Sequence, residues 1–174
     1  IGIHILMDRH DVVIENMDIS HWGSANSEGW QLGTDSAIYY SRPGNVRFVF
    51  QRNTIHHPNY DCNNWSELNQ GDTHPMGANA IASYNTGGNH VIRYNWCYSD
   101  KDHYFMDILG GSENYEPEGY PGRDSDINGN LLSECWDDAI EADGGGLNGR
   151  IWGNYITETF CGVSLATVHY GPIY

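Results

Sequence analysis

Residues 130–165 read NLLSECWDDAIEADGGGLNGRIWGNYITETFCGVSL and contain two copies of one short unit. Asn130 recurs as Asn154, 24 residues later, and Ile140 recurs as Val163 after a deletion of one residue. A glycine-rich turn and the short strand-like run RIW separate the two copies. Short β-prone runs that repeat at this period indicate a solenoid, in which successive turns of the chain stack on one another.

The same unit recurs upstream, anchored on an asparagine that follows an apolar strand residue by three positions. The predicted anchors are Asn16, Asn53, Asn95, Asn130 and Asn154. Two residues after the last four anchors comes a residue that we expect to point inward: Ile55, Cys97, Leu132 and Ile156. The first repeat departs from this rule, because Asp18 occupies that position and Ile19 is displaced by one. Asparagine tolerates left-handed φ and its amide can pair with the main chain, so stacked anchors predict a ladder of amides at one corner.

A third column of apolar residues recurs in the same phase. Its predicted members are Ile3, Ile38, Ile81, Met106, Ile140 and Val163, followed two residues later by Ile5, Tyr40, Ser83, Ile108, Ala142 and Leu165. Since side chains alternate between the two faces of a strand, the intervening residues are expected to face outward together: His4, Tyr39, Ala82, Asp107, Glu141 and Ser164. No stretch shows helical periodicity with caps, and the hairpins of an antiparallel β-sandwich would not keep these columns in phase. We therefore expect an all-β solenoid.

Residues 1–174 are expected to form one solenoid domain of about six turns. Three polar stretches exceed what a corner needs and are predicted to be loop excursions, near residues 21–34, 56–77 and 110–124. Long loops in a compact solenoid are usually functional, and these three would wall a groove over one face. Both ends of the chain resemble uncapped strands, which predicts a fragment of a longer solenoid and, as partners, further turns or copies of the chain stacked end to end.

The composition limits the partners. The formal net charge is −15, from 8 Lys and Arg against 23 Asp and Glu. Such a surface repels nucleic acid and anionic membranes, so neither is an expected partner, and no apolar run predicts membrane insertion. It also repels polyuronates unless a cation intervenes. The 21 glycines and the 13% of aromatic residues fit an extracellular solenoid, secreted or at the cell surface, that binds sugars.

The four cysteines, Cys62, Cys97, Cys135 and Cys161, leave their redox state open. Cys97 falls in an inward column and is expected to be a core residue. Cys135 and Cys161 are expected on the same side of adjacent turns, where a disulfide is one possibility. No Cys or His spacing suggests a zinc site.

At this point the sequence resembles a known family. The runs VIRYN, GNLLSECWDDAIEADGG and NGRIWGNYI are similar to right-handed parallel β-helix repeats of the pectate-lyase-like superfamily. The resemblance covers nearly the whole chain and implies a right-handed, single-stranded parallel β-helix. That superfamily contains polysaccharide lyases, glycoside hydrolases, uronan epimerases, phage tailspikes and non-catalytic surface proteins, so the fold does not decide the function.

The motif Asp137-Asp138-x-x-Glu141 is the sharpest candidate site. Asp107 is predicted in the same outward column as Glu141 one turn earlier, at an inter-strand spacing of about 5 Å. Stacked carboxylates repel one another unless a cation neutralises them or one is protonated. Ca²⁺ prefers six to eight oxygen ligands of this kind. The motif also resembles the Asp-Asp-x-x-Asp calcium site of family-nine pectate lyases, with Glu141 in place of the last Asp. A metal site, a catalytic acid/base pair and a solvated corner all remain open.

The catalytic residues follow from the reaction considered. A lyase of the resembled type polarises a uronate carboxylate with Ca²⁺ and abstracts a proton with Lys or Arg. Lys101 is the only lysine and precedes the acidic motif by one turn, so Arg123, on a groove-lining loop, is the better placed candidate. His103 is the one histidine retained as a candidate. A hydrolase needs two carboxylates, which Asp107 with Glu141, or Asp138 with Asp102, would supply, although the polygalacturonase-type Gly-His-Gly and Arg-Ile-Lys signatures are absent.

Aromatic residues in the predicted loop walls are candidates for stacking on sugar rings. They are Trp22, Trp30, Tyr60, Trp65, Tyr115 and Tyr120. The preferred function is Ca²⁺-assisted β-elimination of a uronate polymer. Metal-independent glycoside hydrolysis is the second choice. The alternative from another class is a non-catalytic surface, fibre or adhesin solenoid.

Overall fold

Parallel strands make up the whole of the regular structure. The computed structural model describes residues 2–23, 35–59, 62–68, 74–111, 115–144, 147–165 and 171–174. Within these ranges it has fourteen strands and no helix, and hence no helix long and apolar enough to cross a membrane. Every pairing of strands is parallel. The expected all-β fold with parallel sheets is therefore confirmed.

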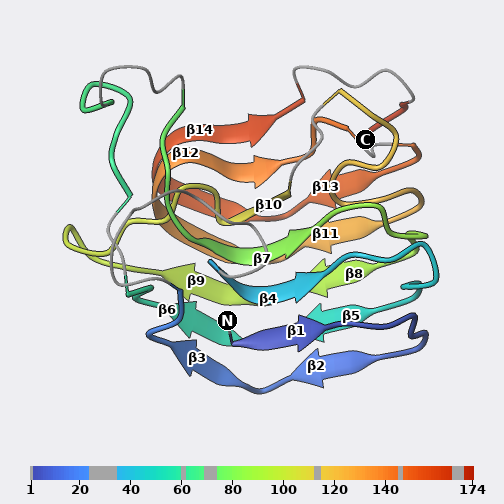
Figure 1. The fold of residues 1–174 in the computed structure, drawn as a ribbon. Helices are drawn as coiled ribbons and strands as arrows, with labels where there is room; N and C mark the ends of the chain where they lie inside the picture. The colour runs from blue at the N-terminus through green and yellow to red at the C-terminus, as the bar shows by residue number, and fades with distance from the viewer. Residues whose placement is uncertain are drawn as a thin grey trace.

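The strands stack in three columns (Figure 1). The first contains β1 (Ile3–Ile5), β4 (Ser36–Tyr40), β7 (Asn79–Ser83) and β10 (Leu109–Gly111). The second contains β2 (Val13–Glu15), β5 (Val49–Gln51), β8 (Val91–Arg93), β11 (Asp126–Asn128) and β13 (Arg150–Trp152). The third contains β3 (Asp18–Ser20), β6 (Thr54–His56) and β9 (Trp96–Tyr98). The long strands β12 (Leu131–Glu141) and β14 (Tyr155–Ser164) continue the third column and then bend into the first.

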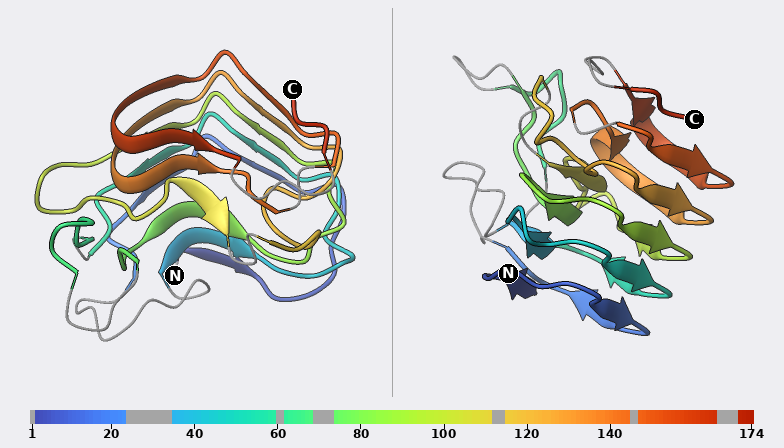
Figure 2. Two further views of the ribbon diagram at one scale, coloured as in Figure 1. Left: turned by 90° about the horizontal axis from the view of Figure 1, so that it is seen from above. Right: turned by 90° about the vertical axis from the view of Figure 1, so that its right-hand side faces the viewer.

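The chain passes through the three columns in the same order again and again. Seen from above, successive coils lie over one another (Figure 2). Because β12 joins the first column to the third, these two form one nine-stranded curled sheet, and the second column is a separate five-stranded sheet. This arrangement is compatible with the solenoid that the repeats predict. The connections from β6 to β7 and from β10 to β11 correspond to two of the expected excursions, and most of the third, near residues 21–34, lies outside the described residues.

Strand register confirms most of the predicted columns. Ile3 pairs with Ile38, Ile38 with Ile81, and Ile140 with Val163, as expected. The inward residues predicted two positions after the asparagine anchors are also in register throughout. Ile55 is opposite Cys97, Cys97 opposite Leu132, and Leu132 opposite Ile156. Apart from Ile156, which is partly buried, these third-column residues are at most 1% exposed.

One member of the first column was placed wrongly. Leu109, and not Met106, pairs with both Ile81 and Ile140. The run from Phe105 to Leu109 offers apolar side chains at several positions, and the main-chain hydrogen bonds select the later one. Gly110 therefore lies in register with Ala82, where Asp107 was expected.

The predicted asparagine ladder is present at the corner between the second and third columns. The Nδ2–Oδ1 distance is 3.0 Å from Asn53 to Asn95 and again 3.0 Å from Asn95 to Asn130. Asn130 donates in turn to Asn154 at 2.9 Å. Each amide also donates to a main-chain carbonyl, and the preceding residue adopts a left-handed φ of 55–65° in every rung: Arg52, Tyr94, Gly129 and Gly153.

The first predicted anchor, Asn16, is not part of this ladder. Ile14 pairs in register with Phe50, so the position three residues later is Met17. The main-chain N–H of Met17 donates to Oδ1 of Asn53 at 3.1 Å. Asn16 is instead the left-handed residue before the rung, with φ of 56°. The one-residue offset of Ile19 in the sequence has the same origin.

All four cysteines are thiols rather than half-cystines. Cys135 lies in register with Thr159, whereas Cys161 lies in register with Asp138, because the two strands are offset by a bulge between these pairs. The considered pairing of Cys135 with Cys161 is therefore not formed.

An aromatic cluster fills the interior beside β5 and includes a buried histidine. The His90 ring lies 5.1 Å from Tyr40 and 5.3 Å from Phe48. Its Nδ1 accepts the N–H of Phe48 at 3.2 Å and its Nε2 is 3.1 Å from the Thr86 hydroxyl. Burial lowers the pKa of His90 from 6.5 to about 3.

Acid should therefore destabilise the fold through His90. Between pH 6.5 and 3 only the unfolded chain binds this proton, so the free energy of unfolding falls by up to about 1.4 kcal/mol per pH unit. His90→Asn keeps an acceptor for the Phe48 N–H and removes the titrating group. Urea unfolding at pH 7.5, 6, 5 and 4 should show the stability advantage of the wild type over this variant shrinking as the pH falls. Parallel pH profiles of the two proteins would contradict the assignment.

Candidate functional site

A bulge shapes the corner at which β12 turns into the first column. Cys135 pairs with Thr159 and Asp138 with Cys161, so β12 has two residues, Trp136 and Asp137, where β14 has one. Just before this bulge the chain bends through residue 134, which has a left-handed φ of 63°. The extra residue breaks the regular alternation of side chains and places consecutive acidic residues at one corner.

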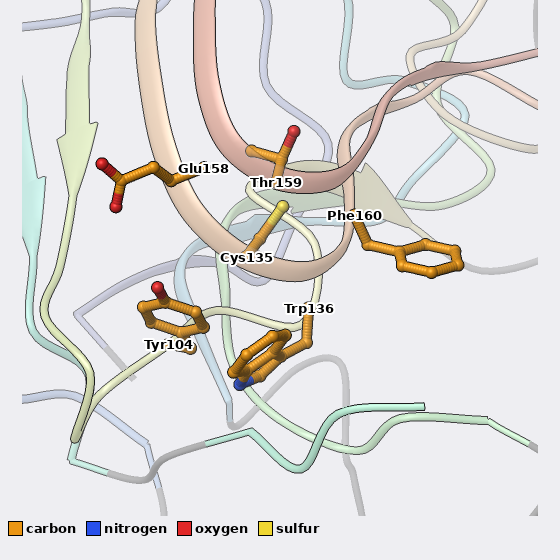
Figure 3. Close-up of a pocket in the computed structure, with 6 residues that line it drawn as sticks. All are labelled: Tyr104, Cys135, Trp136, Glu158, Thr159 and Phe160. Carbon is orange, nitrogen blue, oxygen red and sulfur yellow. The ribbon is translucent and has the colours of Figure 1, made fainter. Parts of the chain in front are cut away.

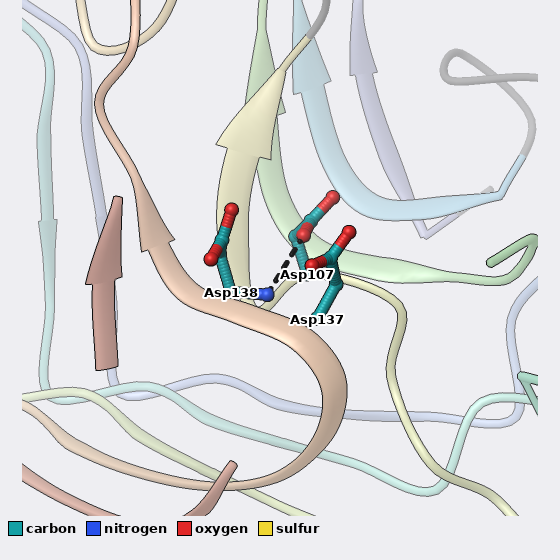
Figure 4. Close-up of side chains that lie close together, drawn as sticks. All are labelled: Asp107, Asp137 and Asp138. Atoms are coloured by element: carbon teal, nitrogen blue, oxygen red, sulfur yellow. Dashed lines mark hydrogen bonds between the residues drawn. The ribbon is translucent and has the colours of Figure 1, made fainter. Parts of the chain in front are cut away.

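The carboxylates gather there in two groups that share Asp138. Asp107, Asp137 and Asp138 form the first, in which one oxygen from each lies within 4.8 Å of the others (Figure 4). Asp138, Glu141 and Asp143 form the second, with the same limit. All five residues are 1–7% exposed. Either group has the carboxylate oxygens and the spacing to hold a metal ion.

A direct hydrogen bond joins Asp107 and Asp138. The N–H of Asp138 donates to Oδ1 of Asp107 at 3.1 Å, and Nδ2 of Asn79 donates to Oδ2 at 3.3 Å. Burial, followed by the charge of Glu141 and the neighbouring carboxylates, raises the pKa of Asp107 well above its usual range. Burial also raises the pKa of Asp138 to about 6, against an opposing hydrogen bond from Cys161. Both side chains are therefore shifted towards the protonated form.

A loop between β6 and β7 supplies the positive charge of the site. Nε2 of His74 is 2.8 Å from Oδ2 of Asp137, and its Nδ1 is 2.8 Å from the carbonyl oxygen of Pro75. The hydrogen bond to Asp137 raises the pKa of His74 to about 9, so the imidazole is protonated at neutral pH. Nε1 of Trp65, from the same loop, donates to the other oxygen of Asp137 at 3.3 Å. Both carboxylate oxygens of Asp137 are therefore held by groups from this loop.

The four residues predicted as metal ligands are brought together, but in a different arrangement. The corrected register puts Asp107 at the level of Asp138 rather than of Glu141, whose charge still acts on Asp107. Glu141 reaches back to accept the N–H of Gly111 at 3.2 Å. Asp143 was missed: it lies two residues beyond the end of β12, where its carboxylate joins those of Asp138 and Glu141.

The predicted bases have partners outside the acidic cluster. Nζ of Lys101 is 2.6 Å from Asp102, and Nε of Arg123 is 2.8 Å from Asp124, both at the surface. His103 lies in the loop before β10, where its ring is 6.0 Å from that of His57. Asp102 does not pair with Asp138, as the hydrolase alternative required. Its side chain is 66% exposed and pairs with Lys101 instead.

The aromatic candidates divide by burial. Trp22 is 3% exposed and stacks on Phe105 at 5.9 Å, and Tyr120 is 2% exposed, so both rings belong to the core. Tyr115 is 69% exposed and Trp65 contacts the cluster. Trp30 and Tyr60 lie outside the described residues.

Two cavities lie beside the acidic cluster along the bulge. The first, of about 260 Å³, is lined by Tyr104, Cys135, Trp136, Glu158, Thr159 and Phe160 (Figure 3). The second, of about 360 Å³, is lined by Asn64, Trp65, Ser66, Trp136 and Phe160. Trp136 and Phe160 are shared walls, and Trp65 connects the second cavity to Asp137. The position of Trp136 directly before the Asp pair is the one signal in the sequence for these rings.

Comparison of the chain with protein-family models, with curated proteins and with solved structures finds no match in any of the three.

Proposed function

We propose that this chain is a right-handed parallel β-helix of the pectate-lyase-like kind that hydrolyses glycosidic bonds of an extracellular polysaccharide. The fold part of the proposal is supported by the coiled parallel columns and the asparagine ladder. The reaction is supported by one observation. Three nearly buried carboxylates meet within 4.8 Å, two of them shifted towards the protonated form and the third paired with a protonated histidine.

Glycoside hydrolysis needs one carboxylic acid and one carboxylate at the scissile bond. Asp138, with a pKa raised to about 6, retains a protonated fraction near neutral pH and is the proposed general acid. Asp137, paired with His74, is the proposed nucleophile, because oxygens within 4.8 Å leave no room for the attacking water of an inverting pair, which needs about 6.5–9.5 Å. Asp107 positions Asp138 by accepting its N–H. Environments that separate the protonation states of neighbouring carboxyl groups are typical of such pairs.

The second candidate is Ca²⁺-assisted β-elimination of a uronate polymer, favoured by the two carboxylate triads that share Asp138. The donor set fits Ca²⁺, which takes several carboxylate oxygens and would relieve their mutual repulsion. A bound Ca²⁺ would supply Lewis-acid polarisation of a substrate carboxylate. Arg123 or Lys101 would have to leave its present ion pair to serve as the base. The two candidates make opposite demands on Asp138, since a metal ligand is ionised and a general acid is protonated.

Calcium therefore separates the candidates. The chain is incubated with neutral polysaccharides and with polyuronates, in chelator or in excess Ca²⁺, and both reducing ends and the ultraviolet absorbance of unsaturated product are measured. If the chain is a hydrolase, reducing ends form in chelator without unsaturated product. The yield of reducing ends is then lower in excess Ca²⁺. Unsaturated product that requires Ca²⁺ would replace the first candidate by the second. No product on any polymer in either condition would reject both.

A further inference from the structure

The two cavities lined by Trp136 and Phe160 form one cleft, and among its described lining residues Trp65 alone was a predicted site residue. We propose that this cleft binds uncharged pyranose rings of the substrate, and that the polysaccharide is neutral rather than a polyuronate. The inference rests on the proposed function in one respect, because it places the bound chain across the acidic cluster. Its physical basis is the shape, the aromatic lining and the charge of the cleft.

The lining combines flat rings with hydrogen-bonding groups. Tyr104 and Trp136 lie 4.5 Å apart between ring centroids, and Trp65 and Phe160 lie 5.9 Å apart (Figure 3 shows the first pair and Phe160). Aromatic faces suit the apolar C–H surface of a sugar ring. Polar groups from Asn64, Ser66, Glu158 and Thr159 line the same cavities and can fix hydroxyl groups.

The position of Phe160 supports a ligand rather than internal packing. This ring is 67% exposed although it projects from a strand, at the single residue of β14 that faces the bulge of β12. Trp65 is 37% exposed beside it. The cleft therefore presents a contiguous aromatic surface to solvent, directly next to Asp137 through the Trp65 hydrogen bond.

The charge of the cleft selects against uronates. Its only ionisable carboxylate is Glu158, and the acidic cluster lies alongside, without a lysine or arginine among the described lining residues. All eight Lys and Arg of the chain fall in the described ranges and lie elsewhere: Arg9, Arg42, Arg47, Arg52, Arg93, Lys101, Arg123 and Arg150. The protonated His74, next to Trp65, is already paired with Asp137, so a polyuronate would bring one further carboxylate per ring into a field that stays negative. Hydroxyl-only sugars carry no such penalty.

Binding is tested without turnover. Isothermal titration of the Asp138→Asn chain, in chelator, uses hexasaccharides of glucose, xylose and mannose together with hexagalacturonate. We expect at least one neutral hexasaccharide to bind and hexagalacturonate to bind at least tenfold more weakly. Phe160→Ala and Trp136→Ala, added separately, should each weaken neutral binding at least tenfold.

The matched control is Tyr155→Ala. Tyr155 is also an exposed ring on β14, 64% exposed, but it lines neither cavity, so its loss should leave binding unchanged. Because Phe160 is exposed, its truncation should preserve the thermal unfolding midpoint. Tighter binding of hexagalacturonate, or neutral binding that Phe160→Ala leaves intact, would overturn the cleft assignment. Neutral binding without cleavage by the wild type would reject the proposed hydrolysis and leave the cleft assignment standing.

Discussion

Asn95→Ala is expected to lower the free energy of unfolding by about 3–5 kcal/mol, enough to unfold a marginal domain. Asn95 is 1% exposed and occupies a central rung of the ladder. Its amide donates to the carbonyl of Phe50 at 3.0 Å and to Oδ1 of Asn130 at 3.0 Å. Its oxygen accepts both the main-chain N–H and the side-chain amide of Asn53. Truncation removes the acceptor of the buried Asn53 N–H and the side-chain donor to the Phe50 carbonyl.

Asn154→Ala is the graded control. Asn154 is the last rung, makes the same kind of bonds, and is only partly buried, so water can replace what its side chain supplied. We expect it to lose about 1–2 kcal/mol. Chemical unfolding of both variants, followed by circular dichroism, measures the difference. A loss in Asn95→Ala no larger than in Asn154→Ala would show that the ladder is not a central source of stability.

The ladder also shows what the sequence could reveal about the fold. Four rungs were predictable because an asparagine recurs three residues after an inward apolar residue. The first coil failed because Val13 and Ile14 are both apolar. Only the strand register shows that Ile14 is the residue in phase, with Val13 55% exposed. A two-residue ambiguity in an apolar run moved the predicted anchor by one position, onto Asn16.

The same ambiguity displaced the candidate site. Met106 and Leu109 both fit the inward column, and the loop between β9 and β10 carries no repeat to decide between them. Choosing Met106 put Asp107 opposite Glu141, whereas the register puts it at the level of Asp138. The acidic composition of the site was therefore predictable from the sequence, and its internal geometry was not.

Loop residues were the hardest to predict. His74 contacts Asp137 from 63 positions earlier in the chain, through a loop with no repeat signal. Trp22 and Trp65 looked alike as loop aromatics, yet one is in the core and the other lies beside the cluster. The difference arises from how each loop folds back on the coils, a tertiary property that neither composition nor spacing encodes.

Asp138→Asn is expected to reduce kcat/KM for glycoside hydrolysis by about 10²–10⁴ while making the protein more stable at neutral pH. An amide cannot deliver the proton, which accounts for the loss of rate. The gain in stability follows from linkage. The pKa of Asp138 is about 6 in the folded chain and near 3.8 when unfolded, so the stability that its proton confers is lost as the pH rises from about 3.8 to about 6 and stays lost above that. Removing that charge should raise the free energy of unfolding at pH 7.5, in chelator, by about 1–2 kcal/mol after allowance for solvent screening.

The two effects together identify the role of Asp138. The stability gain should vanish below about pH 4, where the folded and unfolded wild type both hold the proton. Asp102→Asn is the control, because Asp102 is exposed and pairs with Lys101 away from the cluster, so neither rate nor stability should change. A loss of activity accompanied by a loss of stability would mean that Asp138 holds the fold together rather than carrying the reaction. If Ca²⁺ stabilises the wild type but not this variant, Asp138 is a metal ligand and not the general acid. The calcium-dependent mechanism, which needs a separate base, then replaces hydrolysis.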